Sequence, residues 1–382
     1  MKKILLTDCC ELVMGQSPVS SSYNTEKRGL PFYQGNADFG KINPITRCWC
    51  DKPIKIAYKD DILISVRAPI GAINIASEEC CIGRGLAAVR ALKGKCLYEF
   101  LYYALQSNTE ELKSQGTGST FKAISKQILA NSELPDITLE EQHRIVNRLL
   151  KVDTLIENAN EQLRLFDQLV KSRFIEMFGD FKRNVHGYPT CNIGVVAKLQ
   201  GGYAFKSNDF IDYGVRLVQI GNVNKDNLDW NTNICLPENF LIKYKAFSLR
   251  EDDIVMALTR PIIKSLSAVK IAVVGKNDLP SLLNQRVGRF VVNEKLINRT
   301  YLMYLCRMED FKNYVESMSG NSLQPNISSN QVENYNILLP PLELQNQFAD
   351  FVEQVNKSKL EVQKSLEELE TLKKSLMQQY FG

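Results

Sequence analysis

The residues best suited to chemistry in this sequence are its thiols, its histidines and two pairs of adjacent carboxylates. Ten cysteines are scattered along 382 residues, and none of them forms a CxxC pair. A zinc site built from Cys48, Cys50 and an adjacent cysteine pair is one interpretation. Reduced, mostly buried thiols are the other, and we favour it because both histidines are far from the cysteine clusters in the sequence.

Other catalytic patterns are missing from the sequence. It contains no GxxxxGK(S/T) phosphate loop, and GRG at 83–85 is too short to hold a nucleotide. LPPL at 339–342 lacks the polar first residue with which an adenine methylase holds the amino group. Asp60–Asp61 and Asp252–Asp253 each precede an apolar strand, so we interpret them as turn caps. We therefore expect a binding and positioning protein without catalytic or metal-binding residues of its own.

The elements that would position a binding site are short strands. In residues 1–138, alternating apolar runs at 61–69, 71–77 and 85–91 predict strands between glycine and proline turns. A helix is predicted at 95–115 and a short strand near 133–137. Strands and helices do not alternate regularly, which favours a mixed α/β (α+β) lobe over a doubly wound sheet.

Residues 138–179 predict one long helix. Apolar residues from Ile145 to Val170 recur at alternating steps of four and three, which is a heptad seam. Thr138 and Glu141 have the spacing of a capping box at its start. At 1.5 Å per residue such a helix extends for about 60 Å, and its apolar seam requires a partner helix.

An internal repeat supplies that partner. Residues 119–179 align without a gap with residues 322–382, at a constant offset of 203 and with 14 identities in 61 positions. DDILISVRAPI at 60–70 also corresponds to DDIVMALTRPI at 252–262, at a different offset. The second seam runs from Phe348 to Tyr380, with Lys359 and Lys373 in two of its positions.

We therefore predict a tandem duplication of lobe plus long helix. The predicted segments are a first lobe at 1–138, a central spacer helix at 139–180, a second lobe at 181–341 and a C-terminal spacer helix at 342–382. A pseudo-twofold axis would make the two long helices antiparallel, as a coiled coil that separates two similar lobes.

Composition and charge narrow the class of protein. The chain is 44% hydrophobic and 24% charged, and no apolar run approaches the length that spans a bilayer, so we expect a cytoplasmic protein. Residues 1–138 carry 17 Lys+Arg against 14 Asp+Glu, and residues 181–341 carry 19 against 14. Both long-helix segments are net acidic, with 6 against 8 and 5 against 7. The positive charge of the lobes is the distribution that nucleic-acid contact requires.

The whole chain resembles the specificity subunit of type I restriction–modification systems. The resemblance rests on the lobe–helix–lobe–helix order and on MGQSP at 14–18, DDILISVRAPIG at 60–71, LEEQHRIV at 139–146, MALTRPII at 256–263, LNQRVGRF at 283–290 and LPPLELQNQF at 339–348. It implies that each lobe is a target recognition domain for one half of a bipartite site in double-stranded DNA. It also implies that the helices dock two modification (methyltransferase) subunits and that restriction subunits join them. S-adenosylmethionine, ATP and Mg would be bound by those partners, with no cofactor in this chain.

Candidate contacts follow from loops that match between the lobes. Amides such as Asn36 could pair with adenine, and cations such as Lys122 with phosphate. The difference between GRG at 83–85 and Asn284–Gln285–Arg286 would let the two lobes read different sequences. The candidate DNA-binding residues are Gln16, Ser17, Asn36, Arg67, Arg84, Ser119, Lys122, Tyr203, Phe205, Lys206, Asn222, Arg260, Lys264, Asn284, Gln285, Arg286, Asn321 and Gln324.

The outer faces of the long helices are the expected docking surface for partner subunits. Leucines that lie off the seams are the candidates there, namely Leu150, Leu155, Leu165, Leu360 and Leu372. A plain intramolecular coiled coil is the simpler interpretation of the same helices. Two rival functions are a scaffold that presents two protein-binding lobes without DNA, and a methylase or nuclease with an unfamiliar site.

Overall fold

The computed structural model describes residues 2–117, 122–179, 183–320 and 323–382. The chain divides into two compact units, each made of one lobe and parts of two long helices. Unit 1 comprises Met1–Glu161 and Gln363–Gly382, and unit 2 comprises Gln162–Val362. Each copy of the sequence repeat therefore contributes helix to both units.

The lobe of unit 1 is built from two small sheets and a strand pair. Its four-stranded sheet is antiparallel in the order β2-β10-β7-β8, and its five-stranded sheet has the order β3-β5-β4-β9-β6, with β4 and β9 parallel. Strand β1 pairs with β11 close to the start of the long helix. The strands are β1 (Lys3–Leu5), β2 (Cys10–Met14), β3 (Tyr23–Asn24), β4 (Leu30–Tyr33), β5 (Trp49–Cys50), β6 (Ile56–Ala57), β7 (Ile62–Ser65), β8 (Ile73–Ile75), β9 (Cys80–Ile82), β10 (Leu86–Ala91) and β11 (Glu133–Pro135), and the short helices are α1 (Leu6–Cys9), α2 (Tyr98–Ser107), α3 (Thr109–Ser114) and α4 (Lys126–Ala130).

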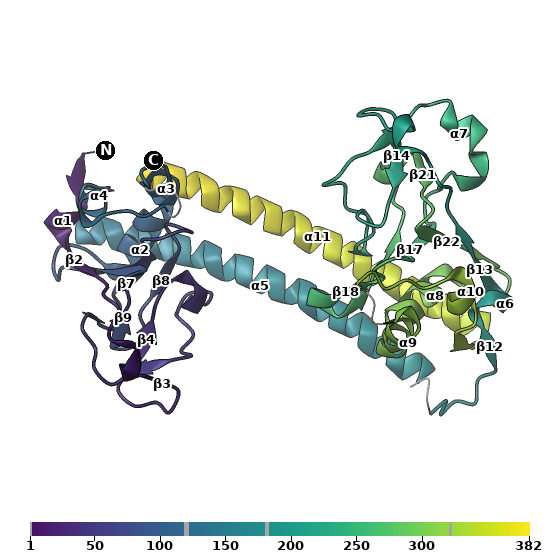
Figure 1. Cartoon of the computed structure of the whole chain (residues 1–382), viewed down its shortest axis with the longest axis horizontal. Helices are drawn as coiled ribbons and strands as arrows, with labels where there is room; N and C mark the ends of the chain where they lie inside the picture. The colour runs from purple at the N-terminus through teal and green to yellow at the C-terminus, as the bar shows by residue number, and fades with distance from the viewer. Residues whose placement is uncertain (1, 118–121, 180–182, 321–322) are drawn as a thin grey trace. The chain divides into compact units, whose positions relative to one another are not determined.

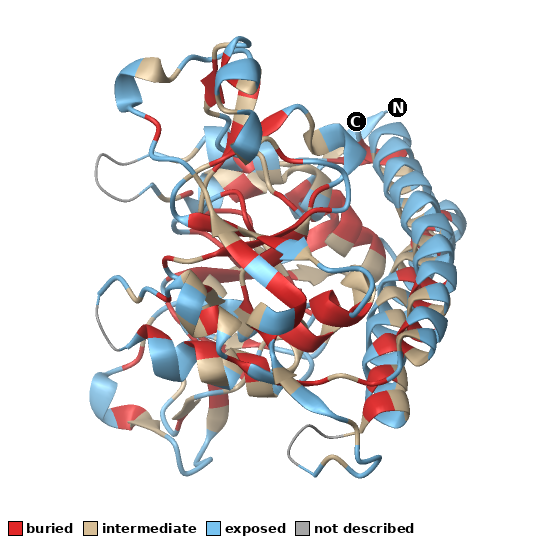
Figure 2. Cartoon of the chain, turned by 90° about the vertical axis from the view of Figure 1, so that its right-hand side faces the viewer, coloured by how far each residue is buried: buried red, intermediate tan, exposed pale blue. Residues whose placement is uncertain are grey.

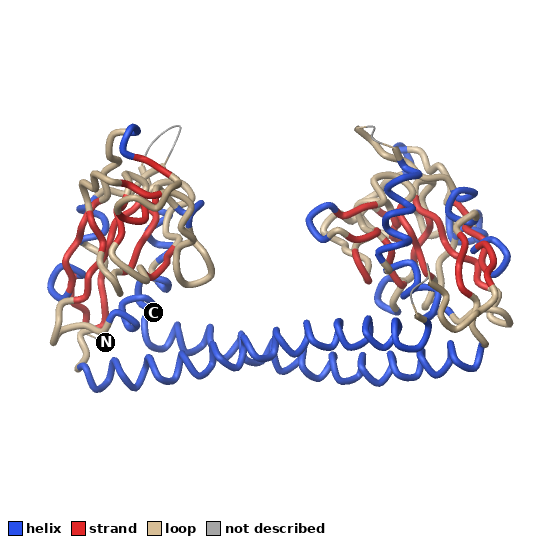
Figure 3. Tube along the Cα trace, turned by 90° about the horizontal axis from the view of Figure 1, so that it is seen from below, coloured by secondary structure: helices blue, strands red, loops and turns tan. Residues whose placement is uncertain are grey.

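The lobe of unit 2 repeats this plan. Strands β13, β22 and β17 pair as β2, β10 and β7 do, and the parallel pair β14–β21 matches β4–β9. Figure 3 shows the strands of each lobe gathered together. The strands are β12 (Thr190–Asn192), β13 (Ala197–Gly201), β14 (Val215–Val218), β15 (Lys225–Asp226), β16 (Cys235–Leu236), β17 (Ile254–Ala257), β18 (Ile262–Ile263), β19 (Ala268–Val269), β20 (Ile271–Val273), β21 (Ser281–Leu283), β22 (Val287–Val292) and β23 (Asn336–Leu338), and the short helices are α6 (Ile193–Val196), α7 (Phe240–Lys243), α8 (Arg299–Arg307), α9 (Glu309–Ser319) and α10 (Ser329–Glu333).

The two long helices are α5 (Leu139–Phe178) and α11 (Leu342–Phe381), which confirms the predicted duplication of a mixed α/β lobe plus helix. Thr138 Oγ1 accepts the backbone N–H of Glu141 at 3.3 Å, as the predicted capping box requires. In unit 1 the start of α5 packs against the end of α11, and Ile145 and Leu149 share a core with Tyr380. In unit 2 the end of α5 packs against the start of α11, so the pairing is antiparallel in each unit.

The predicted seams are the packed faces of both helices. Leu149, Val152, Val170 and Val352 are buried, whereas the opposite faces are largely exposed (Figure 2). Two lysines interrupt the second seam, and each meets a carboxylate on α5. Lys373 Nζ lies 2.6 Å from Asp153 in unit 1, and Lys359 Nζ lies 2.6 Å from Asp167 in unit 2.

One predicted element is wrong in detail. The helix expected at 95–115 is two helices, α2 and α3, which are separated at Asn108. The side-chain amide of Asn108 donates to the Glu133 carbonyl of β11 at 3.1 Å, and the Thr109 hydroxyl bonds the Leu105 and Gly71 carbonyls. The side chains of Asn108 and Thr109 therefore bond neighbouring backbone carbonyls at the break between the two helices and do not point into solvent.

Candidate nucleic-acid interface

In unit 1, loops from four strand ends meet at one edge of the lobe. The backbone N–H of Gln16 donates to Ile82 at 3.0 Å, and the N–H of Arg84 donates to Ser17 Oγ at 3.3 Å. The loop at 34–36 lies against the same place, because a Cβ on Gly85 would stand 2.3 Å from the Gln34 carbonyl. The sequence repeat predicted these loops to be equivalent, and the antiparallel register of β2, β10 and β7 explains why their ends converge.

Two more cationic candidates join the same edge. Val66 N–H donates to the Gly85 carbonyl at 2.9 Å, and Ala68 N–H donates to the Lys122 carbonyl at 3.1 Å. Arg67 and Lys122 are therefore neighbours of the 83–85 loop. We call residues 15–17, 34–36, 67, 83–85 and 122 the unit 1 loop cluster. Gln16, Arg67, Arg84 and Lys122 are exposed in it, and Ser17 and Asn36 are half-buried.

The unit 2 loop cluster is assembled in the same way from residues 202–206, 260, 284–286 and 324–326. Gln285 N–H donates to the Tyr203 carbonyl at 2.9 Å, and Leu258 N–H donates to the Arg286 carbonyl at 2.9 Å. Arg260 N–H donates to the Pro325 carbonyl at 2.8 Å, next to Gln324. Tyr203, Lys206, Arg260, Gln285, Arg286 and Gln324 are exposed, and Asn284 is half-buried.

Aromatic packing supports the exposed ring of Tyr203. Its centroid lies 4.6 Å from that of Tyr244, and a hydrogen bond to the Tyr244 hydroxyl raises the pKa of Tyr203. Phe205 is 92% buried beneath these rings, so it supports the loop and does not present a contact surface as predicted. Lys270 lies behind the cluster. Its pKa is lowered mainly by burial and secondly by the positive charge of Arg260.

A second predicted contact, Asn222, is also wrong. Asn222 is only 1% exposed, and its side-chain amide makes its hydrogen bonds inside the lobe. Its side-chain nitrogen donates to the Asp229 and Thr232 carbonyls at 2.9 and 2.8 Å, while its oxygen accepts from Gln219 N–H at 2.9 Å. Asn222 therefore fixes its own loop and has no amide edge free for adenine. Asn36, its sequence match, stays half-exposed.

One further candidate, Lys264, lies outside both loop clusters. It is exposed in the turn of the β18–β19 hairpin, which packs against α9. Ser119 and Asn321 are outside the described residues. Gln34, which the sequence analysis passed over, is exposed within the unit 1 loop cluster, and the match of FYQGNA with VQIGNV could have indicated it.

The second carboxylate of each acidic pair caps a turn, as the sequence suggested. Asp61 Oδ2 accepts the N–H of Tyr58 at 2.8 Å, and Asp253 Oδ2 accepts the N–H of Arg250 at 2.9 Å. Arg90 also lies 2.8 Å from Asp61. Each second aspartate closes the turn before β7 or β17, which leaves these carboxylates committed to the fold.

All five predicted interface leucines are exposed on the long helices, at between 45 and 51% of their full area. Leu169 and Ile175 on α5 are exposed to the same extent and were not predicted. These side chains are therefore open to solvent, as a docking surface for another protein requires. No helix in the described ranges is both long and apolar enough to cross a bilayer.

All ten cysteines are free thiols, the interpretation favoured from the sequence, and the alternative zinc combination with Cys48 and Cys50 is not assembled. Among residues 2–117, 122–179, 183–320 and 323–382, the one group of three potential metal ligands is Cys9, Cys10 and Cys96. Cys48 and Cys50 do not belong to such a group. Cys50 instead packs against Phe32 and Cys81 in a small apolar cluster.

Taken together, these observations define a duplicated protein with one polar, cationic loop cluster on each lobe. Comparison with known proteins makes the assignment specific. The profile of the type I restriction modification DNA specificity domain matches residues 1–165 and 187–371, and the chain belongs to this family.

Relatives and a solved structure agree with this assignment. The chain is 32% identical over 290 residues to the MjaVIII specificity subunit of Methanocaldococcus jannaschii, covering 73% of this chain and 68% of that subunit. It is 47% identical over 161 residues to the putative MjaX specificity subunit of the same organism, covering 42% of this chain but only 38% of that protein. The type I system S subunit of M. genitalium shares the fold, with a TM-score of 0.56 over 100% of this chain and 96% of that one at 18% identity.

Proposed function

We propose that this chain is the non-catalytic subunit that selects the DNA sequence for a type I restriction–modification complex. Each lobe reads one half of a bipartite duplex site through its loop cluster. The long helices hold modification and restriction subunits, which supply S-adenosylmethionine, ATP and Mg for methylation and cleavage. The complex would act in the cytoplasm, where the host DNA lies.

The observation that carries this proposal is the pair of loop clusters. Equivalent backbone bonds build both clusters, yet their side chains differ. Arg84 lies between two glycines in unit 1, whereas half-buried Asn284 and exposed Gln285 and Arg286 take these places in unit 2. Arginine reads guanine and amides read adenine in the major groove, whereas lysines hold phosphates. Two lobes with the same fold but different side chains in their loop clusters suit a DNA site with two different halves. Two short contacts on one chain also gain affinity through effective concentration.

The test is DNA binding by the chain co-expressed with its modification subunits. Methylation-sensitive sequencing of the host genome first identifies the target. Arg84→Ala is then expected to relax discrimination in one half-site, and Arg286→Ala in the other, by about 1–3 kcal/mol each. Lys93→Ala and Lys295→Ala remove exposed cations outside the loop clusters and serve as matched controls.

The rival scaffold without DNA makes the opposite prediction. It requires no sequence-specific, salt-sensitive binding by the assembled complex, and that result would overturn our proposal. Methyl transfer by the isolated chain would instead favour an enzyme with an unfamiliar site.

A further inference from the structure

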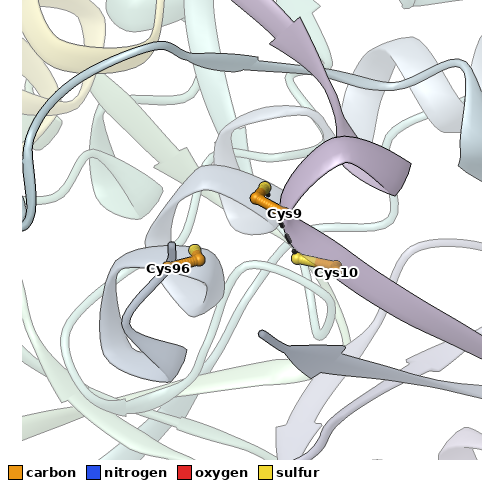
Figure 4. Close-up of side chains that lie close together, drawn as sticks. All are labelled: Cys9, Cys10 and Cys96. Atoms are coloured by element: carbon orange, nitrogen blue, oxygen red, sulfur yellow. Dashed lines mark hydrogen bonds between the residues drawn. The ribbon is translucent and has the colours of Figure 1, made fainter. Parts of the chain in front are cut away.

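Three thiols from distant parts of the sequence meet inside unit 1. Cys9 ends α1, Cys10 begins β2, and Cys96 lies in the turn before α2. Figure 4 shows the three side chains directed toward one another, and their Sγ atoms all lie within 4.8 Å of each other. The Cys9 and Cys10 Sγ atoms are 3.7 Å apart. We call these residues the three-thiol group.

Packing alone does not require sulfur at these positions. Cys10 begins β2 as Ala197 begins β13, so Cys9 matches Val196. Cys96 matches Ile297, because the next residues, Leu97 and Asn298, donate their N–H groups to the equivalent side chains of Gln142 and Gln345. Val196, Ala197 and Ile297 are buried in unit 2, which shows that the same fold accepts apolar residues at all three places.

A charged side chain lies beside the three-thiol group. Lys95 adds a nearby positive charge, and its Nζ is held 2.9 Å from the Asp8 carbonyl. A thiolate, not a thiol, is the form of cysteine that binds metals.

The group is also open to small ions on one side. Cys9 and Cys96 line a cavity of about 210 Å³ together with Asp8, Lys95 and Gln142. A site that is buried in protein but bordered by such a cavity can lose its protons to water and receive an ion from it.

We propose that Cys9, Cys10 and Cys96 bind a soft d¹⁰ cation, Cu(I) or Zn(II), through three thiolates. Metal–sulfur bonds of about 2.3 Å in a trigonal plane place sulfur atoms about 4.0 Å apart, close to the spacing of the three-thiol group. Binding would release three thiol protons to solvent and form three metal–sulfur bonds without any change of oxidation state. The site goes beyond the proposed DNA selection and does not depend on it.

The two ions differ in what else they need. Thiolates suit both Cu(I) and Zn(II), and three sulfurs alone satisfy Cu(I). Zn(II) prefers four ligands, and water in the cavity could provide the fourth. The Asp8 carboxylate is already used, because its Oδ2 accepts the Leu5 N–H at 3.0 Å.

The experiment uses the full chain, reduced and stripped of metal under anaerobic conditions. Cu(I) or Zn(II) is added, unbound ions are removed, and the retained metal is measured together with its X-ray absorption spectrum. The key variant, Cys9→Val with Cys10→Ala and Cys96→Ile, carries the residues that unit 2 already uses. The matched control, Cys48→Ala with Cys191→Ala and Cys235→Ala, removes as many thiols elsewhere.

The wild-type chain and the control are expected to retain one ion each, with three sulfur neighbours, and the key variant none. A fourth, oxygen neighbour would assign the site to Zn(II), and its absence to Cu(I). The bound ion should also raise the melting temperature of the wild type but not of the key variant. If the triple variant does not fold, Cys96→Ile alone should weaken metal binding by more than about 100-fold. Replacing a residue that only supports a metal ligand already lowers metal affinity by up to about 100-fold, and Cys96 would be a ligand itself. Equal retention by wild type and variant, or none by either, would overturn the proposal.

Discussion

The side-chain carbonyl of Gln142 accepts the backbone N–H of Leu97 at 2.9 Å, and its amide donates to the Lys95 carbonyl at 3.0 Å. This buried glutamine near the start of α5 thus binds the turn that leads into α2. Gln345 makes the same bond to Asn298 in unit 2, at 2.8 Å. In each unit, a glutamine at the same position of the repeat therefore joins the lobe to the long helix.

Replacing Gln142 by alanine is expected to lower the free energy of unfolding of unit 1 by about 1–3 kcal/mol, because buried backbone groups lose their partner. Gln345→Ala should do the same to unit 2. Urea denaturation measures both effects. Gln162→Ala, on an exposed face of α5, is the control and should change stability by less than about 0.5 kcal/mol. A loss no larger for Gln142→Ala than for this control would contradict the role assigned to the joint.

The two lysine–carboxylate pairs between the long helices should differ in strength. Asp153 also accepts a hydrogen bond of 2.7 Å from the hydroxyl of buried Tyr103, whereas the Asp167 side chain is 57% exposed. Asp153→Ala is therefore expected to cost about 2 kcal/mol or more, because the phenol is left without a partner. Asp167→Ala should cost about 0–1 kcal/mol. Thermal unfolding of the two variants side by side tests this order, and equal losses would show that Tyr103 finds another partner.

The adjacent glycines Gly201 and Gly202, where the unit 2 loop cluster begins, should respond differently to replacement by alanine. A Cβ on Gly202 would lie 2.2 Å from the Asn284 carbonyl oxygen, whereas a Cβ on Gly201 meets nothing within 4 Å. Gly202→Ala should cost about 1–3 kcal/mol and displace the 284–286 loop. Gly201→Ala should be nearly neutral. Calorimetry measures stability, and DNA affinity of the assembled complex reports the loop, so a silent Gly202→Ala would contradict the close approach.

Unit 2 should lose stability at alkaline pH through Tyr301. Burial raises the pKa of Tyr301, whose hydroxyl donates to the Leu338 carbonyl at 2.9 Å. The pKa of Tyr301 is higher in the folded chain than in the unfolded chain, where it is about 10. The contribution of Tyr301 to the free energy of unfolding is therefore complete below about pH 10, and above that pH it declines by about 1.4 kcal/mol per pH unit. Urea midpoints measured from about pH 8 to 11 should fall less steeply for Tyr301→Phe. Tyr213→Phe, at a residue 88% exposed, should leave the slope unchanged.

The outer face of α5 should be needed for assembly but not for folding. Leu155→Lys places a charge on a half-exposed apolar position, so co-purification with the modification subunits should fall while circular dichroism stays the same. Thr154→Lys adds the same charge at the neighbouring exposed residue and should be tolerated. Full assembly of Leu155→Lys would move the docking surface elsewhere.

Sequence periodicity was most informative where elements are long. The forty-residue helices α5 and α11 carry many turns of the heptad pattern, so their extent and buried faces followed from it. Strands such as β5 and β6 have two residues each, too few for alternation to be recognised. Their pairing depends on contacts between residues far apart in the chain.

The site was predictable only in outline, for the same reason. Matching loops between the lobes indicated Gln16 and Arg84 in unit 1 and Gln285 in unit 2, yet the match could not show that Asn222 turns inward and Asn36 does not. Cys96 joins Cys9 and Cys10 from 86 positions further along, and no local spacing rule links them. Burial and side-chain direction depend on three-dimensional contacts that a one-dimensional pattern does not contain.

Each unit is completed by helix from the other copy of the repeat, since unit 1 needs 363–382 and unit 2 needs 162–178. A single chain thus has the connectivity that two copies would have in a domain-swapped dimer. A chain cut in the linker between the copies should yield halves that remain associated, and one copy alone should pair with itself. Recombination at that linker would exchange the second lobe together with α11, so the incoming helix must carry the same apolar face for both units to form.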